Sequence, residues 1–263
     1  MGLVGRVDSL WRYPVKSMRG EELAEAYVGF SGVYGDRLYA LRSSASPVGF
    51  PFLTGREQEE MILYRPRFRH PDKAVKPANL TEAESISPGL TPLFVNSTDL
   101  GVDVETPSGE MLAVDDPALI RRLAERIGVA PSLALLRSER AMTDCRPVSL
   151  FSVQTVQRLG EEIGGPIDKR RFRANVYVDL GSAAGCGEDG FVGRTLRLGS
   201  KAVISVLERD PRCKMITLDP DTAEPRPEIL RKVARDHDGK AGVYGAVLVE
   251  GMVRQGDEIE LLD

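Results

Sequence analysis

Residues 196–207 read Leu-Arg-Leu-Gly-Ser-Lys-Ala-Val-Ile-Ser-Val-Leu, which places two apolar stretches on either side of a Gly-Ser turn. Two such stretches joined by a short glycine-containing turn are typical of a β-hairpin. A second hairpin is predicted where Val102–Glu105 and Met111–Val114 flank Pro107-Ser108-Gly109. Short strands broken by glycine and proline therefore dominate the expected fold.

Further strands are expected nearer the end of the chain, at Gly242–Glu250 and Glu258–Leu262. Residues 171–179 also alternate between polar and apolar, as a strand does. This alternation predicts one face with Phe172, Ala174, Val176 and Val178, and an opposite face with Arg171, Arg173, Asn175, Tyr177 and Asp179.

Three helices are predicted among these strands. They begin after the N-cap Asp116, at about Ser152 and at Pro227, and they end at Gly128, at Gly164-Gly165 and at about Ala234. Helices are few and do not alternate regularly with strands. This pattern disfavours a doubly wound parallel sheet and favours a β-rich, barrel-like α+β fold.

The clearest domain boundary falls near residues 100–115, which suggests one domain over residues 1–113 and another over residues 114–263. Residues 65–92 are rich in proline and show little periodicity, so they are expected to form an irregular excursion.

Composition excludes several classes of protein. The 35 basic and 39 acidic residues give a net charge of −4, which argues against a nucleic-acid partner. No apolar run approaches the roughly 18 residues of a transmembrane helix, and the first residues lack the apolar core of a signal peptide. A cytoplasmic protein without a membrane partner is expected.

Cysteine and histidine are too scarce for several kinds of site. Cys145, Cys186 and Cys213 lie far apart, which fits neither a disulfide framework nor a thiol-rich metal site. The sequence has only two histidines, His70 and His237, which excludes a histidine-rich metal site. Both stand in polar, loop-like sequence, and a Ser-His-Asp triad is therefore disfavoured. Residues 185–190 match G-x-G-x-x-G, but a strand pattern follows them, which favours a flexible acidic loop over a dinucleotide site.

Cys213 is the strongest candidate for chemistry. It stands in Asp210-Pro211-Arg212-Cys213-Lys214-Met215, after an apolar strand. Positive neighbours favour the thiolate, which is the form that attacks electrophiles and binds metals. The alternative is a half-buried cysteine at a strand end.

A pocket for an anion is the second candidate. Arg171, Arg173 and Asn175 would line one strand face, and Ser152 would begin a helix whose free N–H groups attract anions. Together these residues favour a phosphate-bearing ligand and a plain solvated surface about equally. Lys16 and Arg37 could add to the same positive pocket, although a surface turn is the simpler interpretation of each. Asp219 and Asp221 could bind a cation, but a plain Asp-Pro turn is the simpler interpretation.

These pieces, in this order, resemble the MOSC family, named for the C-terminal domain of molybdenum cofactor sulfurase. The resemblance is to the subgroup with an N-terminal MOSC β-barrel domain, which includes the mitochondrial amidoxime reducing component and its bacterial relatives. It rests on Tyr13–Ser17, Gly35–Arg37, Phe52–Arg56, Pro147–Ser152, Arg171–Asn175, Gly193–Leu196, Arg212-Cys213 and Leu218–Thr222.

The resemblance implies a β-rich, barrel-like MOSC fold, with the N-terminal β-barrel domain over residues 1–113 and the MOSC domain over residues 114–263. It also implies a molybdenum cofactor of the molybdopterin type, with Cys213 as the catalytic metal ligand. The residues matching the cofactor-binding positions are Lys16, Ser17, Arg37, Ser152, Arg171, Arg173 and Asn175. The matching turn at Asp219 and Asp221 has no assigned role.

The implied activity is the reduction of N-hydroxylated small molecules. Because the chain lacks ferredoxin-type cysteine spacing, a separate ferredoxin- or flavin-type electron donor is expected. The alternative is a non-catalytic carrier of the cofactor, or of sulfur on Cys213. Three departures from the family pattern are Met18, Ala174 and the charged stretch Glu208–Pro211, and the last of these leaves the substrate class open.

Overall fold

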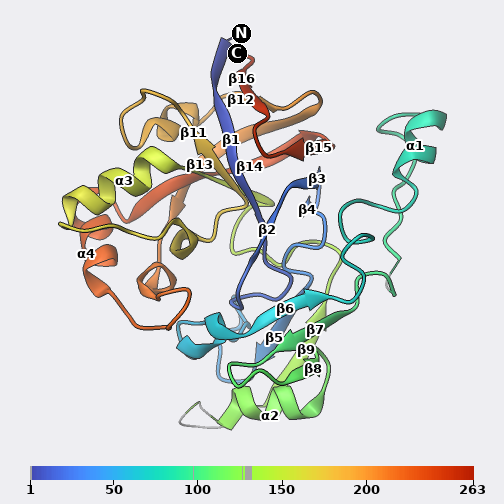
Figure 1. The fold of residues 1–263 in the computed structure, drawn as a ribbon, viewed down its shortest axis with the longest axis vertical. Helices are drawn as coiled ribbons and strands as arrows, with labels where there is room; N and C mark the ends of the chain where they lie inside the picture. The colour runs from blue at the N-terminus through green and yellow to red at the C-terminus, as the bar shows by residue number, and fades with distance from the viewer. Residues whose placement is uncertain (1, 97, 126, 128–131) are drawn as a thin grey trace.

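The computed structural model describes residues 2–96, 98–125, 127 and 132–263, and its centre is a closed ring of seven strands (Figure 1). In ring order the strands are β11 (Val176–Asp179), β10 (Val148–Ser152), β14 (Lys240–Val249), β13 (Ala202–Pro211), β12 (Thr195–Leu198), β16 (Glu258–Leu261) and β1 (Gly2–Arg12). The pairing of β1 with β11 closes the ring, and β2 (Glu21–Leu23) extends it from β1. The predicted β-rich, barrel-like α+β fold is confirmed.

The ring closes around an apolar core because alternate residues of each strand point inward. The core includes Val7, Val176, Ile204, Val243 and Ile259. The predicted hairpin at residues 196–207 forms β12 and β13, and Gly199 supplies the positive φ of 63° that its turn requires. The two strands expected near the end of the chain are β14 and β16, and an unpredicted strand, β15 (Gly251–Arg254), lies between them.

The N-terminal half adds smaller sheets around a second core. One consists of β3 (Glu25–Gly29), β4 (Gly32–Val33) and β15, and another pairs β5 (Tyr39–Ser43) with β9 (Leu133–Arg137). A third contains β6 (Arg65–Phe68), β7 (Val102–Glu105) and β8 (Met111–Ala113), so the second predicted hairpin is also confirmed. Because β1 belongs to the ring and β15 pairs with β3, the two halves of the sequence share strands.

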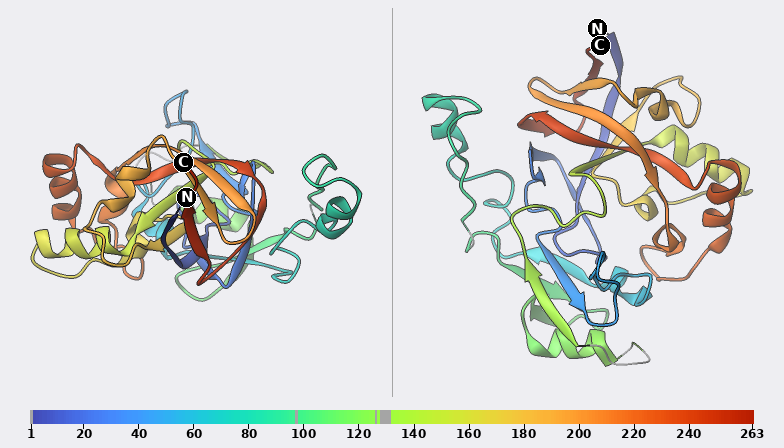
Figure 2. Two further views of the ribbon diagram at one scale, coloured as in Figure 1. Left: turned by 90° about the horizontal axis from the view of Figure 1, so that it is seen from above. Right: turned by 180° about the vertical axis from the view of Figure 1, so that it is seen from behind.

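The three predicted helices are α2 (Pro117–Glu125), α3 (Val153–Glu162) and α4 (Pro227–Asp236). Asp116 accepts a hydrogen bond from the Ala118 amide at 2.7 Å and Ser152 caps α3, as predicted. The predicted end of the first helix, Gly128, lies outside the described residues. Seen from above, α3 and α4 lie on one side of the ring and α1 lies on the other (Figure 2).

The proline-rich stretch forms the expected excursion, an arm beside the ring (Figure 1), but it is not wholly irregular: β6 lies at its base and α1 (Leu80–Ile86) at its tip.

One strand prediction is wrong. Residues 171–179 are not one strand. Four residues form the 3-10 helix η2 (Lys169–Phe172), Arg173 has a left-handed φ of 55°, and only β11 is extended. Tyr177 and Asp179 are on β11 as predicted, whereas Arg171, Arg173 and Asn175 come from η2 and the turn that follows it.

Three further 3-10 helices connect the strands: η1 (Glu59–Leu63), η3 (Gly187–Phe191) and η4 (Lys214–Thr217). Within the part of the chain that the structure describes, no helix combines the length and apolar character needed to cross a membrane.

Candidate functional site

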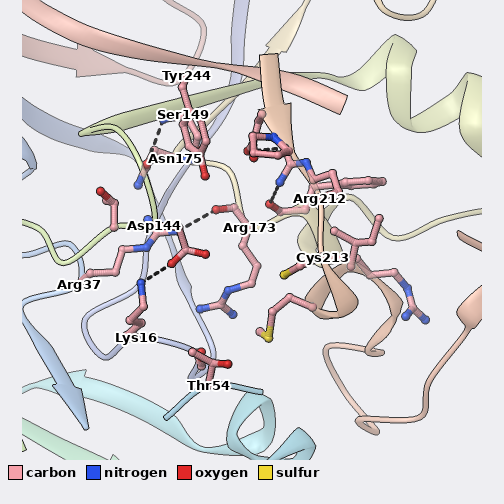
Figure 3. Close-up of a pocket in the computed structure, with 18 of the residues that line it drawn as sticks. Lys16, Arg37, Thr54, Asp144, Ser149, Arg173, Asn175, Arg212, Cys213 and Tyr244 are labelled. Carbon is pink, nitrogen blue, oxygen red and sulfur yellow. Dashed lines mark hydrogen bonds and ion pairs between the residues drawn. The ribbon is translucent and has the colours of Figure 1, made fainter. Parts of the chain in front are cut away.

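A cleft opens where the ring meets the N-terminal half, and most of the predicted site residues line it (Figure 3). These are Lys16, Ser17, Arg37, Arg171, Arg173, Asn175 and Cys213. They come from both halves of the chain, so the closure of the ring by β1 is what brings them together. Figure 3 shows Arg173 and Cys213 extending toward the same central space.

Three of these residues have strained backbones. Ser17, Arg37 and Arg173 have positive φ angles of 66°, 42° and 55°, a region that residues with a Cβ rarely adopt. Such strain persists only where the surrounding structure imposes it, and it gathers at functional sites. Here it turns two guanidinium groups toward the cleft.

Arg173 is a cation without a charged partner among the described residues. Its Nη2 donates to the Met18 carbonyl at 2.8 Å and its guanidinium lies 4.3 Å from the Tyr13 ring centre. Burial lowers the pKa of Arg173 to about 10. Arg37 stacks on the same ring at 4.5 Å, but Asp36 pairs with it at 2.5 Å. A partly buried positive charge left without a counterion, as at Arg173, favours an anionic ligand.

Lys16 lies on the other side of the cleft and does have a partner. Its Nζ donates to the Met142 carbonyl at 2.8 Å and forms an ion pair with Asp144. Burial lowers the pKa of Lys16, and the Asp144 charge opposes that shift. Asp144 remains half exposed, so an entering anion could replace it on Lys16 without moving the lysine.

Arg171 and Asn175 help to build the walls. Arg171 donates to the Thr217 carbonyl at 2.6 Å and pairs with Asp219 at 2.7 Å. Asn175 accepts from the Ser149 hydroxyl at 3.2 Å and donates to the Trp11 carbonyl at 3.3 Å, so it joins β10 to β1.

The Asp219–Asp221 turn is occupied by protein groups. The Asp219 carboxylate accepts from the amides of Asp221 and Thr222, while Asp221 pairs with Arg19 and Arg170. The turn thus braces the loop that follows Cys213, in agreement with the simpler interpretation of this sequence.

Cys213 stands at the end of β13, where it is the N-cap residue of η4, and its thiol is partly exposed. The preceding residue holds the loop: Arg212 donates to the carbonyls of Phe172 at 2.8 Å and Ala241 at 2.7 Å. Its Nη2 also lies 2.7 Å from the Asp210 carboxylate. The cysteine therefore projects from a fixed turn.

The lining residues that the sequence analysis did not assign to the site include Thr54, Asp144, Asp210 and Tyr244. Burial raises the pKa of Asp210 to about 6, and the Arg212 charge and a hydrogen bond from Tyr244 act in the opposite direction. The charged stretch before Cys213 could have pointed to Asp210. Tyr244 has no such signal, because it reads as one more strand residue.

Ser152 is not brought to the cleft. It is fully buried, and its hydroxyl donates to the Glu188 carboxylate at 2.6 Å and caps α3. Glu188 also accepts from the Thr155 hydroxyl at 2.8 Å. Residues 185–190, expected as a flexible acidic loop, instead lead into η3 and bury this carboxylate. Glu188 consequently serves the protein's own helix cap.

The cleft offers one thiolate donor and several cations, and the described residues contain no cluster of three or more metal-binding side chains. Any metal held here would need further ligands from a bound cofactor. The partly exposed Cys213, with the unpaired Arg173 nearby, matches a metal carried by an anionic organic ligand.

Comparison with known proteins covers most of the chain. Residues 4–105 match the MOSC N-terminal beta barrel domain and residues 137–260 match the MOSC domain. The chain is 25% identical to mitochondrial amidoxime reducing component 2 of Bos taurus, over 97% of this chain and 83% of that protein.

Solved structures were also compared with this chain, and two of the matches have TM-scores below 0.5. The YUAD protein from Bacillus subtilis is 14% identical with a TM-score of 0.49, covering 98% of this chain and 94% of its own. YiiM from Geobacillus stearothermophilus is 19% identical with a TM-score of 0.36, covering 45% and 55%.

Proposed function

Because the chain belongs to the MOSC family, with a MOSC N-terminal beta barrel domain ahead of its MOSC domain, we propose that it is an oxidoreductase dependent on a molybdenum cofactor. Its substrates would be N-hydroxylated small molecules, by analogy with the amidoxime reducing component that it resembles. The observation that carries the proposal is that one cleft holds both Cys213 and Arg173, a partly buried cation without a charged partner among the described residues.

The residues of the cleft fit a pterin cofactor that bears a phosphate. Arg173 and Arg37 would bind the anionic group, and Lys16 would exchange Asp144 for it. Asn175 and Ser17 would bind the polar edge of the pterin, and the Cys213 thiolate would ligate the metal. When bound, the cofactor would supply the two-electron redox chemistry that cleaves an N–O bond.

Reduction of an N–OH group to N–H releases water and consumes two protons as well as two electrons. Asp210 lines the cleft, and a carboxyl with a pKa of about 6 can hold and deliver a proton near neutral pH. Tyr244 hydrogen-bonds this carboxyl and would keep it oriented toward the substrate. Electrons would come from a separate ferredoxin- or flavin-type protein.

A second candidate function is storage or delivery of the cofactor, or carriage of sulfur on Cys213, without turnover. The partly exposed thiol favours this candidate as much as the first. A sulfur carrier would hold cyanide-releasable sulfur on Cys213, and a cofactor carrier would bind metal without redox cycling.

The deciding experiment measures molybdenum per chain after expression in a host that makes the cofactor. We expect near-stoichiometric metal in the parent and in Cys145→Ser, whose thiol is exposed, and none in Cys213→Ser. Equal metal in both variants would show that Cys213 is not the ligand. If the loaded protein with a competent donor reduces neither amidoximes nor hydroxylamines, the reductase proposal fails and the carrier remains.

A further inference from the structure

Cys186, His237 and Glu162 form a linked series of side chains outside the cleft. The Cys186 Sγ lies 3.8 Å from Nδ1 of His237, and Nε2 of the same ring lies 2.7 Å from a Glu162 carboxylate oxygen. None of the three lines the cleft described above. A nucleophile in contact with a base that a third group orients is the arrangement that activates thiols and hydroxyls.

Three separate elements bring these residues together. Glu162 ends α3, His237 is the C-cap residue of α4, and Cys186 is the N-cap residue of η3. The helices α3 and α4 pack side by side at this end (Figure 1). His237 lies in the turn between α4 and β14, as its loop-like sequence predicted, but its side chain is only 6% exposed.

The surroundings fix the orientation of the ring. Glu162 is held by Arg158 at 2.9 Å and by Lys232 at 3.8 Å, so its carboxylate is anchored before it meets the histidine. With Nε2–H donated to Glu162, Nδ1 of His237 is left to accept a proton from the thiol. A helix C-terminus also favours the positive ring that this transfer creates.

The charges around the thiol are mixed. Burial, Asp189 and Glu188 raise the pKa of Cys186, while Arg158 and the hydrogen bond to Thr155 lower it. Arg209 pairs with Asp189 and Asp238 and donates to the His237 carbonyl. At rest the sulfur thus keeps its proton, and reaction requires the neighbouring base. Two carboxylates beside the sulfur disfavour anionic reagents.

We propose that Cys186, His237 and Glu162 form a second reactive site, at which Cys186 exchanges with small neutral or cationic disulfides. Nδ1 of His237 takes the thiol proton, and the sulfur attacks one sulfur of the disulfide. The S–S bond breaks, the departing thiolate takes the proton from the ring, and the products are a mixed disulfide and a free thiol. Glu162 acts as a positioning residue.

Disulfide exchange suits this site better than acyl transfer. Acyl transfer would need a pocket for the acyl group beside Cys186, and Cys186 lines neither the cleft nor the cavity beside β3 and β4. Exchange requires only that a small disulfide reach a partly exposed sulfur. The site is independent of the molybdenum proposal, since it uses none of the residues of the cleft.

The test treats the full chain with cystamine and follows each cysteine by mass spectrometry of its peptides after an acid quench. The matched thiol is Cys145, which is more exposed but donates to Glu208 at 3.3 Å and has no imidazole partner. We expect Cys186 to react faster than Cys145. We expect His237→Gln to slow Cys186 by about a hundredfold, leaving Cys145 unchanged.

The pH profile of the parent protein gives a second readout that needs no variant. When a histidine assists a thiol, the reaction rate levels off at the pH where the histidine becomes neutral. The rate of an unassisted thiol instead rises about tenfold per pH unit until the pH reaches the pKa of the thiol. Glu162→Gln should slow the reaction less than His237→Gln does. An unassisted profile for Cys186, or an equal Cys186 rate in folded His237→Gln, would overturn the proposal.

Discussion

Arg173 combines a strained backbone with a positive charge that faces the cleft. A left-handed φ and a position against Tyr13 hold its charge in a partly buried place where, among the described residues, the Met18 carbonyl alone receives a hydrogen bond from its side chain. Both the strain and the missing counterion oppose folding, which is the cost typical of a site prepared for a ligand.

This arrangement predicts that a simple anion stabilises the cofactor-free protein. Millimolar pyrophosphate should raise the melting temperature of the parent, because a ligand that binds only the folded state shifts unfolding by mass action. Arg173→Met should abolish that shift, and Arg140→Met, which alters an exposed arginine outside the cleft, should keep it. Differential scanning calorimetry measures both. Equal shifts in parent and Arg173→Met would mean that the anion binds elsewhere.

Asp210 makes a prediction about pH. Its raised pKa of about 6 means that the protonated fraction falls as the pH rises through that value. If Asp210 delivers a proton, kcat of the loaded enzyme should decline above about pH 6. In Asp210→Asn that limb should disappear and kcat should fall by about a hundredfold. A variant that keeps both the limb and the rate would assign the proton to another group.

A site residue could be predicted from the sequence only where neighbouring residues determine its place in the cleft. The departure before Cys213 drew attention to the stretch containing Asp210, and the family motifs pointed to Lys16, Arg37 and Arg173. Asp144 enters the cleft only because its loop folds back against Lys16, and Tyr244 only because β14 pairs with β13. The residues next to Asp144 and Tyr244 in the sequence predict neither of these contacts.

At the scale of elements, sequence patterns predicted helices and strands correctly where contacts between nearby residues decide the structure. They predicted the wrong structure where contacts between distant residues decide it. The hairpins and the three longer helices follow from turn residues and caps a few positions away. The alternation at residues 171–179 was overridden because Arg171 reaches across to Thr217 and Asp219, which draws the chain into η2. The arm with α1 carries too short a helix for its period to be visible.

The pairing of β1 with β11 is the element contact that closes the ring, and it depends on a glycine. A Cβ at Gly5 would lie 2.4 Å from the Asp179 carbonyl oxygen, whereas one at Gly2 would meet nothing within 4 Å. We expect Gly5→Ala to lower the free energy of unfolding by about 1–3 kcal/mol and Gly2→Ala to leave it nearly unchanged. Urea titration tests this, and equal midpoints for the two variants would contradict it.

At the scale of the whole molecule, the shared strands bear on domain independence. The boundary near residues 100–115 separates sequence segments, but β1 lies within the ring and β15 pairs with β3. Two units that exchange strands in this way should unfold together.

This leads to a prediction with a built-in probe, because Trp11 is the chain's one tryptophan and lies on β1. Its fluorescence and the far-ultraviolet circular dichroism of the whole chain should show coincident urea transitions. A fragment of residues 1–113 should lack a cooperative transition when expressed alone. Two separated transitions would indicate independent domains.

The first described strand, β1, pairs with β16, near the other end of the chain. During synthesis β1 must therefore wait until residues 258–261 have been made before it can pair with β16 and complete the ring. Lys16 and Cys213 become neighbours of one cleft only after that moment. A cofactor would therefore be inserted after translation. In the interval before insertion, the newly made chain would need protection from aggregation.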